Sequence, residues 1–338
     1  MKRVGIYQNT LTSGGRIKVI TAMTYVFNEM GLTPDWIAFR NTLSHNKLNN
    51  IISKDIRARF KILRNFTKGL SEFKYVRMNQ RMSKLTKEYD LIVNSNNTLV
   101  YTSDNENVIH YIHFPREARL LEKYSNSTIQ YRFYKTLFQK MYISYLSDAK
   151  PKGIFIANSE FTKSAMLDVY PLQASDIFVL YPPVQRPSNS LKGTRKVPNK
   201  VLSLGRFGVN KDQLFQINLA EMVPEGEFFI MGFVNNTKSL RYYKQCQRAI
   251  KSKGIKNVRL VKDANRDLVQ KELKSASVFL HTMVDEPFGI ATVESLFYGC
   301  LPLSHNSGGQ KEIIGEDKFL YTSIEDAQIK LRWLISMV

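Results

Sequence analysis

Short apolar runs alternate with helical patterns along most of the chain. Each run is followed by a polar or glycine-containing turn and then by a stretch with helical spacing, which is the pattern of a parallel sheet with crossover helices. The runs expected to form buried strands are 4–7, 91–93, 108–112 and 153–157 in the first half, and 201–204, 227–231, 258–261, 278–280 and 301–304 in the second. The sequence therefore predicts an α/β protein built from two parallel-sheet halves.

The boundary between the halves is expected near Tyr181, Pro182 and Pro183. The following residues 185–200 are polar and show no sustained periodicity, which is typical of a linker or a surface loop. A length of 338 residues, at roughly 150 residues per domain, also favours two domains. We therefore predict domains 1–184 and 185–338.

The chain is strongly basic. It carries 49 Lys and Arg against 29 Asp and Glu, a net charge of +20. Residues 1–184 hold 26 basic and 14 acidic side chains, and residues 185–338 hold 23 and 15, so the charge is shared by both halves. Such a surface attracts an anionic partner: nucleic acid, a phosphorylated ligand or an acidic membrane face.

Other features of the composition exclude several classes of protein. A hydrophobic content of 43% is ordinary for a globular chain. Cys246 and Cys300 are too few for a disulfide framework or a metal cluster. No apolar run approaches the ~18 residues of a membrane span, and the N-terminal apolar stretch is shorter than a signal peptide requires. We expect a cytoplasmic protein, with peripheral attachment to the cytoplasmic membrane face as the alternative.

One segment, residues 47–87, departs from the α/β pattern. It holds 12 basic and two acidic residues, and its apolar residues recur at steps of three or four from Leu48 to Phe73, which predicts a helical face. The helix can pack its apolar face on the sheet and leave a solvated basic face, or it can lie on an anionic bilayer. A second basic helix, rich in aromatic residues that we expect in the core, is predicted over 130–146.

A basic loop follows the expected strand 201–204. It begins with Gly205 and Arg206, and Lys211 comes five residues after the arginine. An Arg supplies a bidentate hydrogen-bond donor and a Lys a point charge, so the two side chains can bind a pyrophosphate together. The loop lacks the Gly-Lys-Ser/Thr ending of a Walker A motif, and a pair of solvated loop charges is the alternative.

Two glutamates eight residues apart follow the expected strand 278–280. Glu286 lies in a loop, and Glu294 is expected in the opening turn of a helix over 292–298. Ligands of open α/β sheets bind at the carboxyl ends of the strands, where a carboxylate can accept hydrogen bonds from sugar or ribose hydroxyls. The alternatives are a favourable charge at a helix N-terminus for Glu294 and a surface charge for Glu286.

Two adjacent glycines, Gly308 and Gly309, follow the expected strand 301–304 and precede a helix. Their backbone N–H groups are expected to lie bare and close to any ligand, as in an anion-binding cradle. A tight turn is the alternative.

In this order and spacing the three elements resemble the donor half of glycosyltransferase family 4, enzymes of the GT-B fold that use nucleotide sugars. The pair Glu286-x7-Glu294 with its Phe288-Gly289-Ile290 centre resembles the family's hallmark motif. Arg206 and Lys211 are similar to the basic residues that hold the donor diphosphate. The stretches 280–294 and 305–309 look most like cytosolic mannosyltransferases that extend lipid-linked oligosaccharides from GDP-mannose. Pro287 restricts the backbone of Glu286 toward extended geometry, so we expect the sugar pocket to differ in detail from that of the family.

The first half resembles the same family more loosely. Gly14, Gly15 and Arg16 are similar to its glycine loop, which approaches the donor phosphate and the acceptor. His113 resembles the strand-end histidine beside the transferred sugar. The resemblance implies two Rossmann-like domains facing a central cleft, with 1–184 binding the acceptor and 185–338 the donor.

The resemblance also implies a mechanism. Transfer retains the anomeric configuration, and the absence of an Asp-x-Asp motif argues against a bound divalent ion. The residues implied in catalysis are His113, Arg206, Lys211 and Glu286. Those implied in donor binding are Gly14, Gly15, Arg16, Gly205, Phe288, Gly289, Ile290, Glu294, Gly308 and Gly309. No cofactor is expected. GDP-mannose is the preferred donor, with a UDP-sugar as the alternative, and the acceptor is a lipid-linked or polyanionic glycan at an anionic membrane surface or in solution.

Two other classes stay open. A basic nucleic-acid-binding protein fits the charge, but the chain shows no recognised nucleic-acid motif, so we expect no nucleic-acid partner. A sugar epimerase or phosphorylase also uses two α/β halves, although no lysine motif for a pyridoxal cofactor is present.

Overall fold

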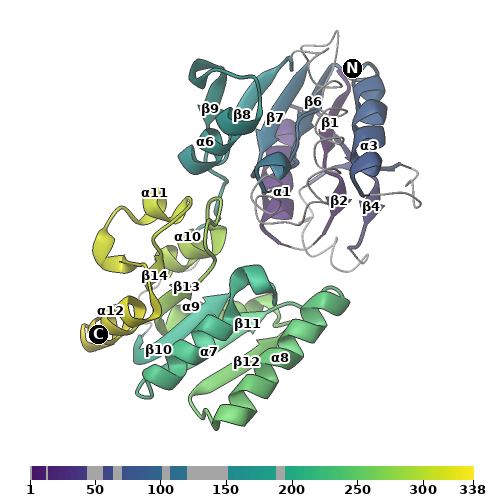
Figure 1. The fold of residues 1–338 in the computed structure, drawn as a ribbon. Coiled ribbons are helices and arrows are strands. Elements are labelled where there is room, and N and C mark those ends of the chain that lie inside the picture. The colour runs from purple at the N-terminus through teal and green to yellow at the C-terminus, as the bar shows by residue number, and fades with distance from the viewer. Residues whose placement is uncertain are drawn as a thin grey trace, which may run out of the picture. The chain divides into compact units, whose positions relative to one another are not determined.

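A computed structural model gives the architecture of the chain. It describes residues 2–12, 14–43, 56–63, 71–100, 107–119, 151–187 and 195–338. The chain divides into two compact units, Met1–Pro183 (unit 1) and Val184–Val338 (unit 2), which Figure 1 colours from purple to teal and from green to yellow. The helix predicted over 130–146 lies outside the described residues.

Unit 1 contains a sheet of seven strands in the order β5-β3-β1-β6-β7-β8-β9. The strands are β1 (Val4–Tyr7), β3 (Asp35–Ala38), β5 (Arg59–Ile62), β6 (Leu91–Asn94), β7 (Val108–Ile112), β8 (Ile154–Ala157) and β9 (Ile177–Val179). All neighbouring pairs are parallel. The four strands predicted in this half are confirmed. From β1 the chain adds strands on one side, then returns to the other side at β6, so the strand order reverses between β1 and β6 (Figure 1).

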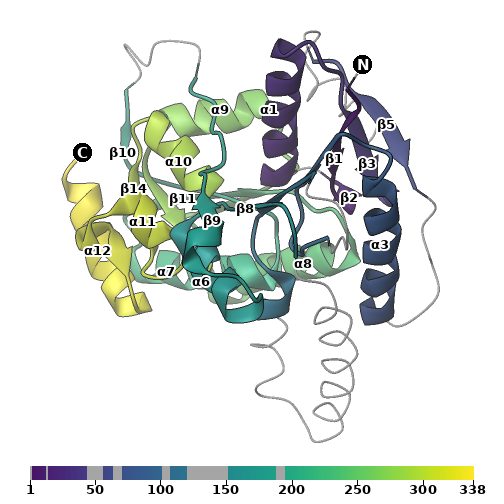
Figure 2. The same cartoon turned by 90° about the horizontal axis from the view of Figure 1, so that it is seen from above.

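Helices α1 (Gly15–Glu29) and α3 (Ser71–Thr86) cover opposite faces of this sheet (Figure 2). Trp36 donates its indole N–H to Thr24 of α1 at 2.8 Å, whereas Ile37, the next residue of β3, packs with Met78 and Met82 of α3. Successive side chains of a strand point to opposite faces, so the two helices are on different sides. Helix α6 (Glu160–Val169) also belongs to this unit.

The single helical face expected from residue 48 to 73 is wrong, because Arg59–Ile62 form strand β5. The strand pairs with β3, and Arg59 Nε donates to Asp35 Oδ1 at 2.7 Å. This tertiary pairing overrides the helical spacing that the sequence shows. Farther along, Met78 and Met82 of α3 are 5% and 0% exposed, so the apolar face of that helix is in the core and not free to enter a bilayer. Residues 44–55 and 64–70 are outside the described ranges.

Unit 2 contains a parallel sheet of six strands in the order β12-β11-β10-β13-β14-β15. The strands are β10 (Val197–Leu204), β11 (Glu227–Gly232), β12 (Val258–Lys262), β13 (Ala276–His281), β14 (Leu301–His305) and β15 (Leu320–Tyr321). The helices are α7 (Gln213–Met222), α8 (Thr237–Lys253), α9 (Arg266–Ser275), α10 (Ile290–Phe297), α11 (Gln310–Ile314) and α12 (Ile324–Ser336). All five strands predicted here are confirmed, and the order reverses between β10 and β13.

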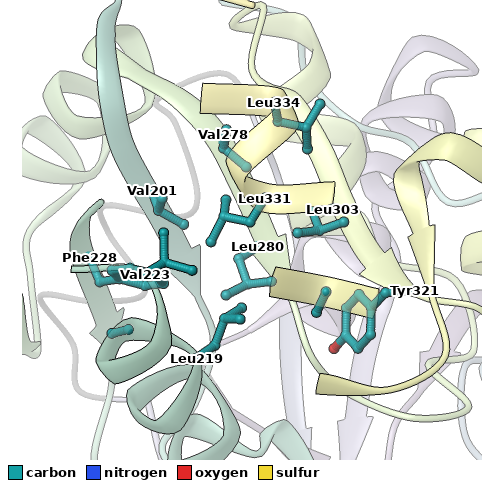
Figure 3. Packing of buried hydrophobic residues seen from close by; sticks show 12 residues of the cluster. Val201, Leu219, Val223, Phe228, Val278, Leu280, Leu303, Tyr321, Leu331 and Leu334 are labelled. Atoms are coloured by element: carbon teal, nitrogen blue, oxygen red, sulfur yellow. The ribbon is translucent and has the colours of Figure 1, made fainter. Parts of the chain in front are cut away.

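The main core of unit 2 lies between this sheet, α7 and α12. Leu331 and Leu334 of α12 pack with Val278 and Leu280 of β13, and Leu219 of α7 packs into the same cluster (Figure 3). All five side chains are at most 1% exposed. Burying each of them removes about 1.5–3 kcal/mol of unfavourable contact with water, which holds β13, and therefore the loop that follows it, in place.

Candidate functional site

The loop after β10 is fastened to the end of β13. Gly205 donates its N–H to the carbonyl of Met231 at 3.0 Å, and the aliphatic stem of Lys211 lies against Gly205. Thr282, which follows β13, donates its hydroxyl to the carbonyl of Lys211 at 2.6 Å and accepts from Gln216 Nε2 at 2.7 Å. Because β10 and β13 flank the reversal of strand order, this is the edge where open α/β sheets bind ligands.

Three ionisable side chains meet at this edge. The Lys211 ammonium contacts the Glu286 carboxylate at Oε2, and His281 Nε2 lies 3.2 Å from the same oxygen. The side chains of Lys211, Glu286 and His281 are 24%, 15% and 4% exposed. Sequence reasoning placed Lys211 and Glu286 in the site, and the structure brings them into direct contact; it missed His281.

The electrostatics of this cluster favour an ionised glutamate and a neutral histidine. Burial alone would raise the pKa of Glu286, but the charge on Lys211 and the hydrogen bond from His281 hold it well below its usual range. Burial lowers the pKa of His281, and the hydrogen bond to Glu286 only partly offsets this, while the charge on Lys211 lowers it further. One positive and one negative charge thus balance each other beside an uncharged ring.

The glycine pair packs against the loop that carries Glu286. Gly309 donates its N–H to the carbonyl of Glu286 at 2.8 Å, so the expectation that this amide lies bare for an anion is wrong. Gly308 has φ +63, and a Cβ there would come within 2.5 Å of the same carbonyl. The two glycines allow the loops after β13 and β14 to approach each other, and their predicted role in donor binding stays a prediction.

The loop between Glu286 and α10 is ordered by a buried amide. Gln310 Nε2 donates to the carbonyl of Phe288 at 3.1 Å. Gly289 has φ +109, and a Cβ there would overlap with that amide nitrogen. Phe288 is buried and Ile290 half-buried. The sequence signal for this arrangement was the Phe288-Gly289-Ile290 motif; Gln310 carried no signal of its own.

Glu294 does not lie where the sequence placed it within its helix. Helix α10 begins at Ile290 and not at Thr292, so Glu294 falls in the second turn, where a helix N-terminus contributes little to its stability. Its carboxylate is 11% exposed and lies 3.8 Å from the guanidinium of Arg266 in α9. The structure thus places Glu294 largely buried on α10, beside Arg266 of α9.

Arg206 follows Gly205, and its side chain is exposed. Its carbonyl accepts from Gln213 Nε2 at 3.1 Å, which fixes the backbone of the loop. Its guanidinium makes no hydrogen bond or ion pair within the described ranges, so the structure does not bring it into the cluster of Lys211 and Glu286.

A second polar edge lies in unit 1, beside its own reversal of strand order. His113 follows β7, is 8% exposed, and makes a hydrogen bond between its Nε2 and Ser95 Oγ at 2.9 Å. Burial, reinforced by the charge on Arg16, lowers the pKa of His113 to about 3. The ring is therefore neutral near pH 7 and can contribute a hydrogen bond but no positive charge.

The glycine segment of unit 1 forms the start of α1. Gly14 is the residue before the helix and has φ +134, a backbone conformation that L side chains rarely adopt. Gly15 is the first residue of the helix, and no side chain caps its N-terminus within the described part of the chain. Arg16 follows in the first turn. Uncapped N–H groups at a helix N-terminus favour an anionic group.

The parts of the chain that the structure describes hold neither a metal-binding cluster nor a helix suited to cross a membrane. There, no three His, Cys, Asp or Glu side chains lie close enough together to hold a metal ion. Among the helices described, none has both the length and the apolar character needed to cross a membrane.

Residues 187–336, nearly all of unit 2, match the family "Glycosyl transferases group 1". The chain is also 29% identical over 221 residues to a GDP-Man:Man(3)GlcNAc(2)-PP-Dol alpha-1,2-mannosyltransferase of Dictyostelium discoideum, covering 59% of this chain and 43% of the relative. The human enzyme of the same name is 26% identical over 207 residues, which cover 54% of this chain and 41% of the human enzyme. The chain thus matches less than half the length of these relatives.

Solved structures match both units. WaaG, a glycosyltransferase of lipopolysaccharide biosynthesis, superposes with a TM-score of 0.72 at 14% identity, covering 98% of this chain and 90% of that one. Anabaena HepE in complex with UDP and glucose superposes with a TM-score of 0.67 at 14% identity, covering 100% of this chain and 89% of HepE. The chain has the GT-B fold, as the sequence predicted, and its residues 187–336 resemble the group 1 glycosyltransferases.

A substitution at Gly308 tests whether the close approach of the two loops matters. Gly308 and Gly315 share nearly the same φ, +63 and +68, but a Cβ at Gly315 has nothing within 4 Å. We expect Gly308→Ala and Gly315→Ala each to lose about 1–2 kcal/mol of unfolding free energy from the left-handed backbone, measured by urea denaturation. Only Gly308→Ala should also weaken nucleotide-sugar binding, because it displaces the backbone of Glu286. Equal binding by the two variants would contradict this assignment.

Proposed function

We propose that the chain is a retaining hexosyltransferase. It transfers mannose from GDP-mannose to a lipid-linked or other glycan acceptor, and it needs no metal ion. The proposal is supported by the match of residues 187–336 to the group 1 glycosyltransferases and by the similarity of the chain to GDP-mannose-dependent mannosyltransferases. Because the HepE complex contains UDP, a UDP-sugar is the alternative donor.

The observation that carries the proposal is the contact between Lys211 and Glu286. A nucleotide sugar joins a hydroxyl-rich ring directly to a diphosphate. A ligand of that kind needs an acceptor of hydroxyl hydrogen bonds and a positive charge side by side, which is what this pair presents. We assign Glu286 to the sugar hydroxyls, Lys211 to the diphosphate and Glu294 to the ribose, with Arg206 as a second cation for the diphosphate.

In the reaction, the bond between the sugar C1 and the phosphate oxygen breaks, and the acceptor oxygen forms the new glycosidic bond on the same face. The proton of the acceptor hydroxyl passes to the departing phosphate oxygen, so no protein nucleophile is required. Negative charge grows on the leaving diphosphate, and Lys211 and Arg206 stabilise it more in the transition state than in the ground state. Interactions of this type accelerate the reaction and do not only bind the donor.

Unit 1 supplies the second group of residues. The N-terminus of α1 at Gly14 and Gly15, which no side chain caps among the described residues, fits a phosphate, and we assign Arg16 to the same group. His113 stays neutral near pH 7, which follows from its lowered pKa. We assign it to orienting the sugar through a hydrogen bond, and not to neutralising the leaving group.

A panel of nucleotides tests the donor site. We expect GDP and GDP-mannose, added at 100 times their dissociation constant, to stabilise the protein by about 2.7 kcal/mol, measured as a thermal shift. Glu294→Ala should weaken nucleotide binding by about 10- to 100-fold, because a charged hydrogen bond is lost. Glu316→Ala, at an exposed carboxylate paired with Lys318, is the matched control and should bind as the wild type. A thermal shift with UDP or ADP but not with GDP would contradict guanine as the base of the donor. The absence of a shift with every nucleotide would contradict the proposed transferase function.

We also propose that the basic face of α3 contacts an anionic membrane that carries the acceptor. The apolar face of α3 is in the core, whereas Arg77 and Lys84 are exposed. Each basic residue near such a surface contributes about 1 kcal/mol. We therefore expect Arg77→Glu/Lys84→Glu to reduce flotation with vesicles containing phosphatidylserine.

The matched control is Lys244→Glu/Lys251→Glu, which makes the same change of charge at two exposed positions of α8 in unit 2. If both double variants lose flotation equally, the attraction is one of net charge and the assignment to α3 is wrong. If neither loses it, the membrane contact does not involve α3.

A further inference from the structure

His281 is the last residue of β13 and makes a contact that the assignments above do not use. Its ring is 4% exposed, and Nε2 lies 3.2 Å from Oε2 of Glu286. We propose that His281 is a positioning residue for the donor sugar: its Nε2–H holds Oε2 of Glu286, so that Oε1 is presented to the sugar hydroxyls. The inference rests on the proposed function and adds a role for a residue outside the motif.

The contact determines which ring nitrogen carries the hydrogen. A carboxylate oxygen only accepts hydrogen bonds, so the hydrogen must be on Nε2. The other nitrogen, Nδ1, is buried and has no hydrogen-bond partner among the described residues. A positively charged ring would add a second cation beside Lys211 without a second anion. The neutral Nε2–H tautomer agrees with the contact to the carboxylate, with an Nδ1 that has no partner in the described part of the chain, and with the single negative charge beside Lys211.

Two donors on one oxygen orient the carboxylate. Lys211 Nζ and His281 Nε2 both contact Oε2, and within the described residues Oε1 makes no hydrogen bond. An ammonium on a flexible stem acts as a point charge and fixes no direction. The imidazole is planar and held at the end of a strand, so it supplies the direction that Lys211 does not. Oε1 is thus the oxygen left for a ligand.

The unpaired Nδ1 distinguishes this role from simple packing. A buried polar atom without a partner is unfavourable, and an apolar side chain at position 281 would avoid it. Ser304, which lies beside His281 in the parallel pairing of β13 and β14, also has a buried hydroxyl without a partner and does not satisfy the ring. Within the described residues, the polar contact that the ring makes is the 3.2 Å approach of Nε2 to Oε2 of Glu286.

The test compares three substitutions that differ in where they place a donor. The amide nitrogen of His281→Gln can occupy the position of Nε2, that of His281→Asn occupies the position of Nδ1, and His281→Leu supplies none. We expect kcat/KM for sugar transfer to fall about 10- to 100-fold in the Leu and Asn variants, the effect of losing a hydrogen bond to a charged group. The Gln variant should restore most of the activity. The dissociation constant of GDP, which lacks the sugar, should stay the same in all three.

Two further readouts separate positioning from stability. Since the donated hydrogen bond stabilises the ionised form of Glu286, its loss raises the pKa of that carboxyl. The acid limb of the kcat/KM profile should therefore move to higher pH in His281→Leu and return in His281→Gln. In the ligand-free protein, the ¹⁵N spectrum of histidine should show the Nε2–H tautomer of His281 near pH 7.

The possible failures are distinguishable. An Nδ1–H tautomer, an acid limb that does not move, or a Gln variant no more active than Leu would overturn the role of His281 while wild-type transfer stands. A wild type that binds nucleotide sugar but shows no transfer, or binds none, would overturn the proposed function. In that case the tautomer still decides whether His281 holds Glu286.

Discussion

The site of unit 2 depends on one constraint: the carboxylate of Glu286 must stay ionised although its side chain is only 15% exposed. Burial by itself opposes the charge on Glu286, so a cation must be held beside it. Lys211 is held in position as this cation because the hydroxyl of Thr282, directly after β13, donates a hydrogen bond to the backbone carbonyl of Lys211. On the other side, the backbone of Glu286 can come close to the loop after β14 only because Gly308 and Gly309 have no side chains.

The two sheets place their polar residues by the same rule. In each unit the strand order reverses once among the described strands, and buried polar side chains gather at the carboxyl ends next to that reversal. The chemistry of the two edges differs. Unit 1 offers a neutral histidine, His113, hydrogen-bonded to Ser95, and unit 2 offers a compensated ion pair beside a second neutral histidine. The proposed function therefore assigns the charge that faces the diphosphate to Lys211 and Arg206 of unit 2.

The sequence predicted much of the fold because each central strand is a short apolar run with a turn behind it. Strand β5 could not be found in this way, since Arg59–Ile62 alternate basic and apolar residues and become a strand only by pairing with Asp35 and its neighbours. Within the site, Glu286 and Lys211 carried a motif signal, but their direct contact depends on tertiary structure. His281 lies in the stretch 280–294 that carries the family resemblance, but it reads as the end of an apolar strand, and nothing in the sequence singled it out as a site residue. Its importance becomes visible only when the distance to Glu286 is known.

The most direct test of the account is transfer of labelled mannose. The full chain, in wild-type form and as Glu286→Gln, would be incubated with GDP-[¹⁴C]mannose, a lipid-linked oligosaccharide acceptor and EDTA, and the label in the lipid fraction counted. We expect label in the lipid fraction of the wild-type reaction despite the chelator, and almost none with Glu286→Gln. The amide of glutamine carries no negative charge to neutralise Lys211, and it accepts hydrogen bonds only at its oxygen, whereas a carboxylate accepts at both oxygens. Equal transfer by the two proteins, or wild-type transfer only when a divalent cation is restored, would contradict the account.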